Sequence, residues 1–178
     1  VKVVIEGQGA DETIGGYISS ALPVYLFDLL LHFQISTASK ELNLFLKNYS
    51  LKMAIMLFFR QSDLGFLKNL YYNFSGMDAF FINQLRNHDE IKDYPNEPIG
   101  FDSLLNKHLY KAHTGILVDL IHYGDALSMA NSLESRLPFM DFHLVEFCFT
   151  LRSKFKIMNG KGKYIHREAM KNIITIKL

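Results

Sequence analysis

The tightest constraint on the fold lies in the first twelve residues. A β-branched run at residues 3–5 stops at Gly7 and Gly9, which is typical of a buried strand that runs into a tight turn. Asp11 and Glu12 come next, and two acids in the first turn of a helix complement the positive end of its dipole. The sequence therefore predicts a strand, then a glycine turn, then a helix from Asp11.

The rest of the chain predicts a mainly α fold. We expect residues 1 to 6 to form the only substantial strand, at the edge of a larger parallel sheet. Residues 3–5 lack alternation, as expected for a strand that such a sheet covers on both faces. Further on, apolar residues recur at helical spacing. The helices are expected at about 24–33, 38–48, 50–60, 78–86, 105–120, 125–131, 141–151 and 164–173, with an exposed loop over 89–100.

Composition excludes several classes of protein. The 178 residues are 49% hydrophobic, which fits one globular domain, and 19 basic against 18 acidic residues leave no broad field to attract nucleic acid or anionic lipid. One cysteine, Cys148 between two phenylalanines, excludes an internal disulfide framework and predicts a buried thiol in a cytoplasmic protein. The apolar run from Ala21 to Phe33 is too short to span a membrane and contains Asp28, so we expect a core helix.

The glycine turn is the first candidate site. Gly7 and Gly9 have no side chains, so a ligand can approach the backbone closely, and free amides at a helix start can hold phosphate oxygens. The carboxylates of Asp11 and Glu12 would repel phosphate unless a magnesium ion lay between them. The alternative is an ordinary turn with acids placed for the helix dipole.

A second candidate lies at the end of the expected helix over 125–131. There a Glu-x-Arg-x-Pro turn presents Glu134 and Arg136 at one edge, where they pair with each other or face a substrate. Pro138 and Asp141 are expected to form a turn and a helix cap.

A third candidate is Lys163, which lies between Gly162 and Tyr164 and could reach a phosphoryl group. The alternative is a basic loop at a helix start. The histidines add little, because His108 and His113 are five residues apart and no partner completes a zinc pattern.

Taken together and in order, the three motifs resemble the synthetase domain of the asparagine synthase family. Residues 7–17 match Gly-x-Gly-[Ser/Ala]-Asp-Glu-x-x-Gly-Gly-Tyr, residues 128–141 match Ser-Met-Ala-x-Ser-x-Glu-x-Arg-x-Pro-Phe-x-Asp, and residues 163–169 are similar to Lys-Tyr-x-x-Arg-Glu-Ala. The resemblance implies the C-terminal helical part of an α/β ATP-pyrophosphatase fold, spanning residues 1–178. It also implies that ATP converts a substrate carboxylate to an acyl-adenylate, which ammonia derived from glutamine then turns into an amide.

The resemblance also implies roles for individual residues. Asp11 should hold magnesium and, with Gly7, Gly9 and Glu12, the phosphates of ATP. Lys163 should stabilise the adenylation transition state. By the same similarity, the residues nearest the reacting carboxylate or the incoming amine should be Gln8 and Glu134, with Asp125 opening the helix that leads to Glu134.

Some positions depart from the family pattern. Gln8 stands where asparagine-forming members commonly have glutamate, and an amide keeps the hydrogen bonds but cannot act as a base, which argues against aspartate as substrate. Glu6 replaces a small hydroxyl residue, Ala126 a basic one and His166 an aliphatic one.

The Ser-Gly-Gly-x-Asp-Ser pyrophosphate loop and the N-terminal glutaminase domain of the family are absent from these residues and are expected upstream. We therefore expect a fragment that is inactive by itself, cut from an enzyme that is active at full length. The alternative is a non-catalytic interaction or scaffold domain built on the same fold. The sequence leaves open whether the protein forms a homodimer.

Overall fold

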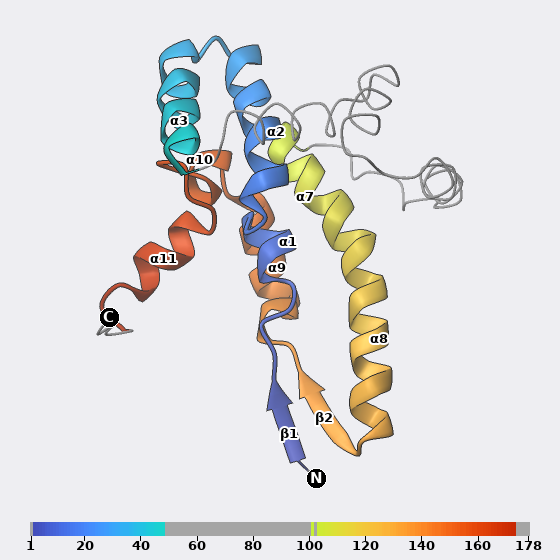
Figure 1. Ribbon diagram of the computed structural model, residues 1–178. Helices are drawn as coiled ribbons and strands as arrows, with labels where there is room; N and C mark the ends of the chain where they lie inside the picture. The colour runs from blue at the N-terminus through green and yellow to red at the C-terminus, as the bar shows by residue number, and fades with distance from the viewer. Residues whose placement is uncertain (1, 49–100, 102, 174–178) are drawn as a thin grey trace.

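The computed structural model describes residues 2–48, 101 and 103–173, and within them the fold is mainly α, as predicted (Figure 1). The expected helices at 50–60 and 78–86 and the loop at 89–100 lie outside these residues. The elements are β1 (Lys2–Ile5), α1 (Ala10–Ile14), α2 (Ile18–Leu31), α3 (Ile35–Asn48), α7 (Leu104–Thr114), α8 (Ile116–Ala130), β2 (Leu133–Arg136), a 3-10 turn (Pro138–Met140), α9 (Phe142–Thr150), α10 (Ser153–Lys156) and α11 (Tyr164–Met170).

The sheet corrects the prediction that residues 1 to 6 form the only substantial strand. β2 pairs with β1 in parallel, with Lys2 opposite Leu133 and Ile5 opposite Arg136. The chain leaves α8, turns through Ser132 in the left-handed region (φ 55°) and then extends beside β1. The turn expected at Glu-x-Arg is therefore a strand, because pairing with a distant segment outweighs local preference.

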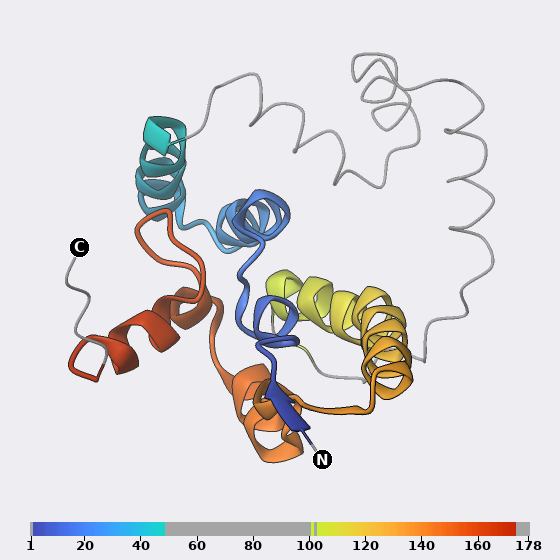
Figure 2. The ribbon, with the colours of Figure 1, turned by 60° about the horizontal axis from the view of Figure 1, so that its bottom comes forward.

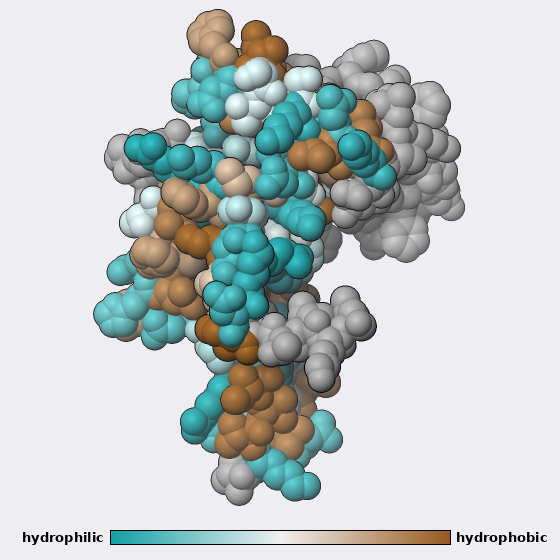
Figure 3. Space-filling view, turned by 90° about the vertical axis from the view of Figure 1, so that its left-hand side faces the viewer, coloured by the Kyte–Doolittle hydropathy of each residue, from teal (hydrophilic) through white to brown (hydrophobic). Residues whose placement is uncertain are grey.

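In the part of the chain that the structure describes, β1 pairs with β2 alone and its side chains are open to solvent, so its coverage within a larger parallel sheet stays a prediction. Val3, Val4 and Ile5 are 46%, 41% and 74% exposed. In Figure 3 hydrophobic surface gathers at the end of the molecule where β1 lies.

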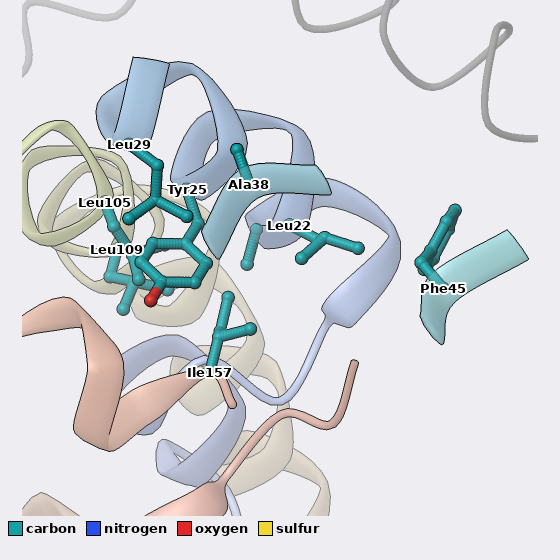
Figure 4. Close-up of a cluster of buried hydrophobic side chains, with 9 residues drawn as sticks. Leu22, Tyr25, Leu29, Ala38, Phe45, Leu105, Leu109 and Ile157 are labelled. Atoms are coloured by element: carbon teal, nitrogen blue, oxygen red, sulfur yellow. The ribbon is translucent and has the colours of Figure 1, made fainter. Parts of the chain in front are cut away.

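The core lies at the other end, where α2, α3 and α7 meet (Figures 1 and 2). Figure 4 shows side chains from these three helices converging with Ile157, which follows α10. The buried residues of this cluster are Ala21, Leu22, Tyr25, Leu29, Ala38, Phe45, Leu105, Leu109 and Ile157.

The apolar run Ala10–Leu31 has the length and composition of a membrane span, yet the chain folds it as two helices, α1 and α2, separated at residues 15–17. In the most apolar 18-residue stretch of this run, 44% of the residues are buried inside the protein, and α2 supplies much of the core. We interpret α2 as the core helix expected from the sequence. It begins at Ile18, earlier than predicted, and includes Pro23.

Two further expectations about helices needed correction and two were confirmed. Gly115 divides the expected helix over 105–120, and α8 then runs without a break through Asp125, which therefore does not open a helix. Asp141 does cap α9, because its carboxylate accepts a hydrogen bond from the Leu144 amide at 3.1 Å. Cys148 is buried, with 3% of its surface exposed.

Candidate active site

The glycine turn places the start of α1 against the segment that follows β2. Gly9 caps α1 in the left-handed region (φ 90°), and a Cβ atom there would lie 2.6 Å from the Met140 sulfur. The Thr13 hydroxyl and amide both donate to the Gly9 carbonyl, at 2.6 and 3.0 Å. Glycine is therefore favoured at position 9 by the backbone angle, and a side chain there would also displace the Met140 thioether.

The first and third motifs meet in an ion pair. Lys163 Nζ lies 2.9 Å from Asp11 Oδ1, and the two side chains are 26% and 33% exposed, so the pair is partly shielded from water while solvent still reaches it. Asp11 lies in the first turn of α1, and Lys163 caps α11 with a left-handed backbone (φ 54°).

Two glycines make this approach possible. A Cβ atom on Gly16 would overlap the Asp11 carboxylate and the Cε of Lys163, and one on Gly162 would overlap the Gly15 carbonyl oxygen. The loop before α11 thus lies directly against the end of α1. The sequence motifs Gly-Gly-Tyr and Lys-Gly-Lys are the two sides of one contact.

Glu12 points toward the interior. Only 3% of the residue is exposed, and its carboxylate accepts a hydrogen bond from Tyr17. Partial burial, followed by the charges of Glu12 and Asp11, raises the pKa of the Tyr17 phenol. Burial lowers the pKa of His113, an effect that Glu12 opposes. The Thr13 hydroxyl lies 3.5 Å from Nδ1 of this histidine.

Two adjoining hollows lie at the carboxyl end of β1. One, of about 410 Å³, is surrounded by the glycine turn and the start of α1; its lining residues are Glu6, Gly7, Gln8, Gly9, Asp11, Glu12, Tyr17 and Leu120. The other, of about 290 Å³, lies between α8 and the end of β2 and includes His122, Asp125, Ser135 and Leu137 in its wall. Glu6, Gln8 and Leu120 line both hollows. All five site residues predicted at positions 7–12 therefore surround one space.

Glu134 lies apart from this group. Its carboxylate oxygen Oε1 is 2.8 Å from Nε of Arg136, both side chains are well exposed (46% and 64%), and Glu134 lines neither hollow. This is the ion pair that the sequence left open as an alternative. On the opposite face of β2, the Ser135 hydroxyl donates to Glu6 Oε1 at 2.8 Å.

Sequence reasoning missed Ser135 and the second hollow. Had residues 133–136 been interpreted as a strand, the two-residue period would have placed Glu134 with Arg136 and Ser135 with Leu137 on opposite faces. No such period is obvious in Leu-Glu-Ser-Arg, because its apolar and polar residues do not alternate.

The donor set fits a magnesium ion that shares its shell with phosphate. Among the described residues, no group of three or more His, Cys, Asp or Glu side chains gathers to hold a metal. Mg²⁺ in nucleotide sites is commonly held by one or two carboxylates together with phosphate oxygens and water. Asp11 offers one such carboxylate at the edge of the larger hollow.

Comparisons with known proteins agree with these motifs. The family model described as Asparagine synthase matches residues 1–175. A Mycobacterium tuberculosis protein whose name is asparagine synthetase (glutamine-hydrolysing) is 29% identical over 98% of this chain and 28% of its own length. The Bacillus subtilis asparagine synthetase (glutamine-hydrolysing) 1 is 30% identical over 48% of this chain and 14% of its own length.

A fungal protein, Amidase chry2 of Gibberella zeae, is 26% identical over 98% of this chain and 30% of its own length. The chain thus spans less than a third of the length of the curated relatives that it matches throughout. No solved structure matches it. With a family model covering nearly every residue, the chain belongs to the asparagine synthase family.

Proposed function

We propose that this chain is the C-terminal part of the synthetase domain of a longer enzyme that adenylates a carboxylate and converts it to an amide with ammonia from glutamine. The observation that carries the proposal is the Asp11–Lys163 pair, held against Gly16 beside the hollow of the glycine turn. A pyrophosphate loop and a glutaminase domain would come from the rest of the protein, and the residues of this chain would be inactive without them.

In the adenylation step, a substrate carboxylate oxygen attacks the α-phosphorus of ATP and the bond to pyrophosphate breaks. Negative charge grows on the departing phosphates, and the Lys163 ammonium would stabilise that charge. Asp11 directs this ammonium through the contact at 2.9 Å. Mg²⁺, when bound by Asp11 and the phosphates, supplies further positive charge.

The second step needs the acyl group to be held beside Gln8. The nitrogen of ammonia would form the new bond to the acyl carbon, the bond from that carbon to the oxygen of AMP would break, and the nitrogen would lose a proton. Gln8 lines both hollows, so its amide can hydrogen-bond a group that lies between them, but it cannot accept the proton as a carboxylate would. We therefore propose a carboxylate substrate other than aspartate.

The proposed substrate space is the smaller hollow. Its described wall combines apolar residues of α8 with Asp125, Ser135 and Glu6. Glu134 stays a prediction for this step, and its ion pair with Arg136 would have to open first. We also propose a cytoplasmic location, which suits a free, buried Cys148.

The test is ATP–pyrophosphate exchange by the full-length protein across candidate carboxylates. Exchange that depends on a carboxylate supports the enzyme, and its absence with every carboxylate favours the scaffold. Lys163→Ala should lower kcat for exchange more than it weakens ATP binding, because the contact strengthens as charge develops. Lys161→Ala is a matched control, since Lys161 is exposed in the same loop. Equal activity of the two variants would remove Lys163 from the catalytic residues.

A further inference from the structure

The helix α3 carries a buried acid that contacts the loop leading to Lys163. Glu41 is 4% exposed and lies on the same face of α3 as Ala38 and Phe45, which belong to the core. Its two carboxylate oxygens accept separate backbone hydrogen bonds, Oε1 from the amide of Asn159 at 2.9 Å and Oε2 from the amide of Gly160 at 2.7 Å. Hydrogen bonds to an ionised group are short and strong, so this contact fixes the turn to the helix.

The turn itself is tight. Met158 and Lys161 exchange two backbone hydrogen bonds of 3.1 Å, and Asn159 and Gly160 between them are both left-handed (φ 56° and 68°). Asn-Gly is the sequence that favours such two-residue hairpin turns. The amides of the two central residues are not used within this hairpin, and Glu41 supplies their acceptors.

The turn also lies flat on the helix. A Cβ atom on Gly160 would come within 3.2 Å of the Cβ of Leu44 and within 3.4 Å of the Phe45 amide nitrogen. Glycine at this position therefore lets the backbone of the turn approach α3 closely enough for both hydrogen bonds to Glu41.

Only two residues separate this turn from Lys163. One residue spans at most about 3.6 Å, so the connection from Gly160 to Lys163 is short. A displacement of Gly160 should therefore also displace Lys163. Gly162, between them, lies against the Gly15 carbonyl and leaves no room for the loop to take up the change.

We propose that Glu41 is a positioning residue for adenylation: it fixes the Asn159–Gly160 turn so that the Lys163 ammonium stays beside Asp11. The inference rests on the proposed role of Lys163. Glu41 touches no reacting group, and its carboxylate acts through the loop alone.

The test compares Glu41→Gln, Glu41→Asp and Lys40→Gln in the full-length enzyme by ATP–pyrophosphate exchange. The glutamine amide presents N–H to one of the two backbone donors, so one hydrogen bond is lost. Displacing a catalytic group by about 1 Å can cost roughly a hundredfold in rate, so we expect Glu41→Gln to lower kcat by about tenfold to a hundredfold with little change in the KM for ATP. Glu41→Asp keeps the charge on a shorter arm and should fall between Gln and wild type. Lys40 is exposed on the same helix and its variant should behave as wild type.

Two further measurements separate the outcomes. Amide hydrogen exchange at Asn159 and Gly160 should speed up in Glu41→Gln, and thermal unfolding shows whether the variant is folded; if it is not, Glu41→Asp carries the test. A kcat equal to wild type in folded Glu41 variants, while Lys163→Ala loses exchange, would overturn the inference alone. Full exchange by Lys163→Ala would instead remove Lys163 from the catalytic residues, and the anchoring of the turn would then have no catalytic consequence. The proposed function itself would be overturned only if the wild-type enzyme showed no exchange with any carboxylate.

Discussion

Replacing Lys156 with methionine should stabilise the protein at neutral pH. Lys156, at the end of α10, is 0% exposed, and its Nζ has no hydrogen-bond partner within the part of the chain that the structure describes. The ammonium lies 4.6 Å from the centre of the Phe149 ring, which offsets part of the cost of burying a charge. Methionine has a similar unbranched shape and carries no charge.

The magnitude follows from the pKa of this lysine. Burial lowers the pKa of Lys156 from 10.5 to about 8, against a smaller opposing effect of Cys148. A shift of this size corresponds to about 3 kcal/mol at about 1.4 kcal/mol per pKa unit. The unfolded chain binds the proton more tightly, so the cost is fully present below pH 8 and disappears as the pH rises toward 10.5. The free energy of unfolding should therefore rise with pH across this window.

Urea unfolding followed by circular dichroism at pH 7 and at pH 10.5 measures the effect. We expect Lys156→Met to raise the free energy of unfolding at pH 7 by about 2–3 kcal/mol, and the difference from wild type to shrink at the higher pH. Burial raises the pKa of the Cys148 thiol and the charge of Lys156 lowers it, so replacing Lys156 also changes the contribution of this thiol at high pH, but not at pH 7, where the thiol is protonated.

Lys154→Met is the control, because Lys154 is exposed on the same short helix. A Lys156→Met protein that is less stable than wild type at pH 7, or a difference that does not depend on pH, would refute the reasoning.

Gly16→Ala should abolish most pyrophosphate exchange, because its Cβ would overlap both partners of the Asp11–Lys163 pair. Exchange equal to wild type in this variant would show that the close contact at Gly16 is not needed. Asp141→Ala removes the cap of α9 and should lower the free energy of unfolding by about 1 kcal/mol, measured by urea denaturation, without slowing exchange by the remaining folded enzyme. Lys163→Arg should restore little of the exchange lost in Lys163→Ala, since a planar guanidinium cannot place its charge where the ammonium lies; full activity of the arginine variant in the same assay would contradict a point-charge role.

Local chemistry in the sequence was enough to predict some features of the structure. The cap at Asp141 and the buried thiol of Cys148 depend on their immediate neighbours, and both were confirmed. The meeting of Asp11 with Lys163 could be expected only because the resemblance assigned both residues to one nucleotide.

Other features depend on contacts between distant segments. The strand β2 exists because β1 lies beside it, and its four residues show no strand pattern of their own. Glu41 and Lys156 are charged residues in helices, which usually face water, and only the packing of α3 and α10 places them inside. One signal was available for Glu41: it lies three residues after Ala38 and four before Phe45, on an otherwise apolar face.

The parallel register of β1 and β2 also limits how this segment can change during evolution. Side chains alternate along a strand, so inserting or deleting one residue in the short connection at Asn131 and Ser132 would exchange the two faces of β2. An insertion would place Glu134 beside Glu6, so that two carboxylates would meet, and a deletion would place Arg136 there. In both cases the hydroxyl of Ser135 would be lost from the smaller hollow. Natural variation in length should therefore be rare at this connection.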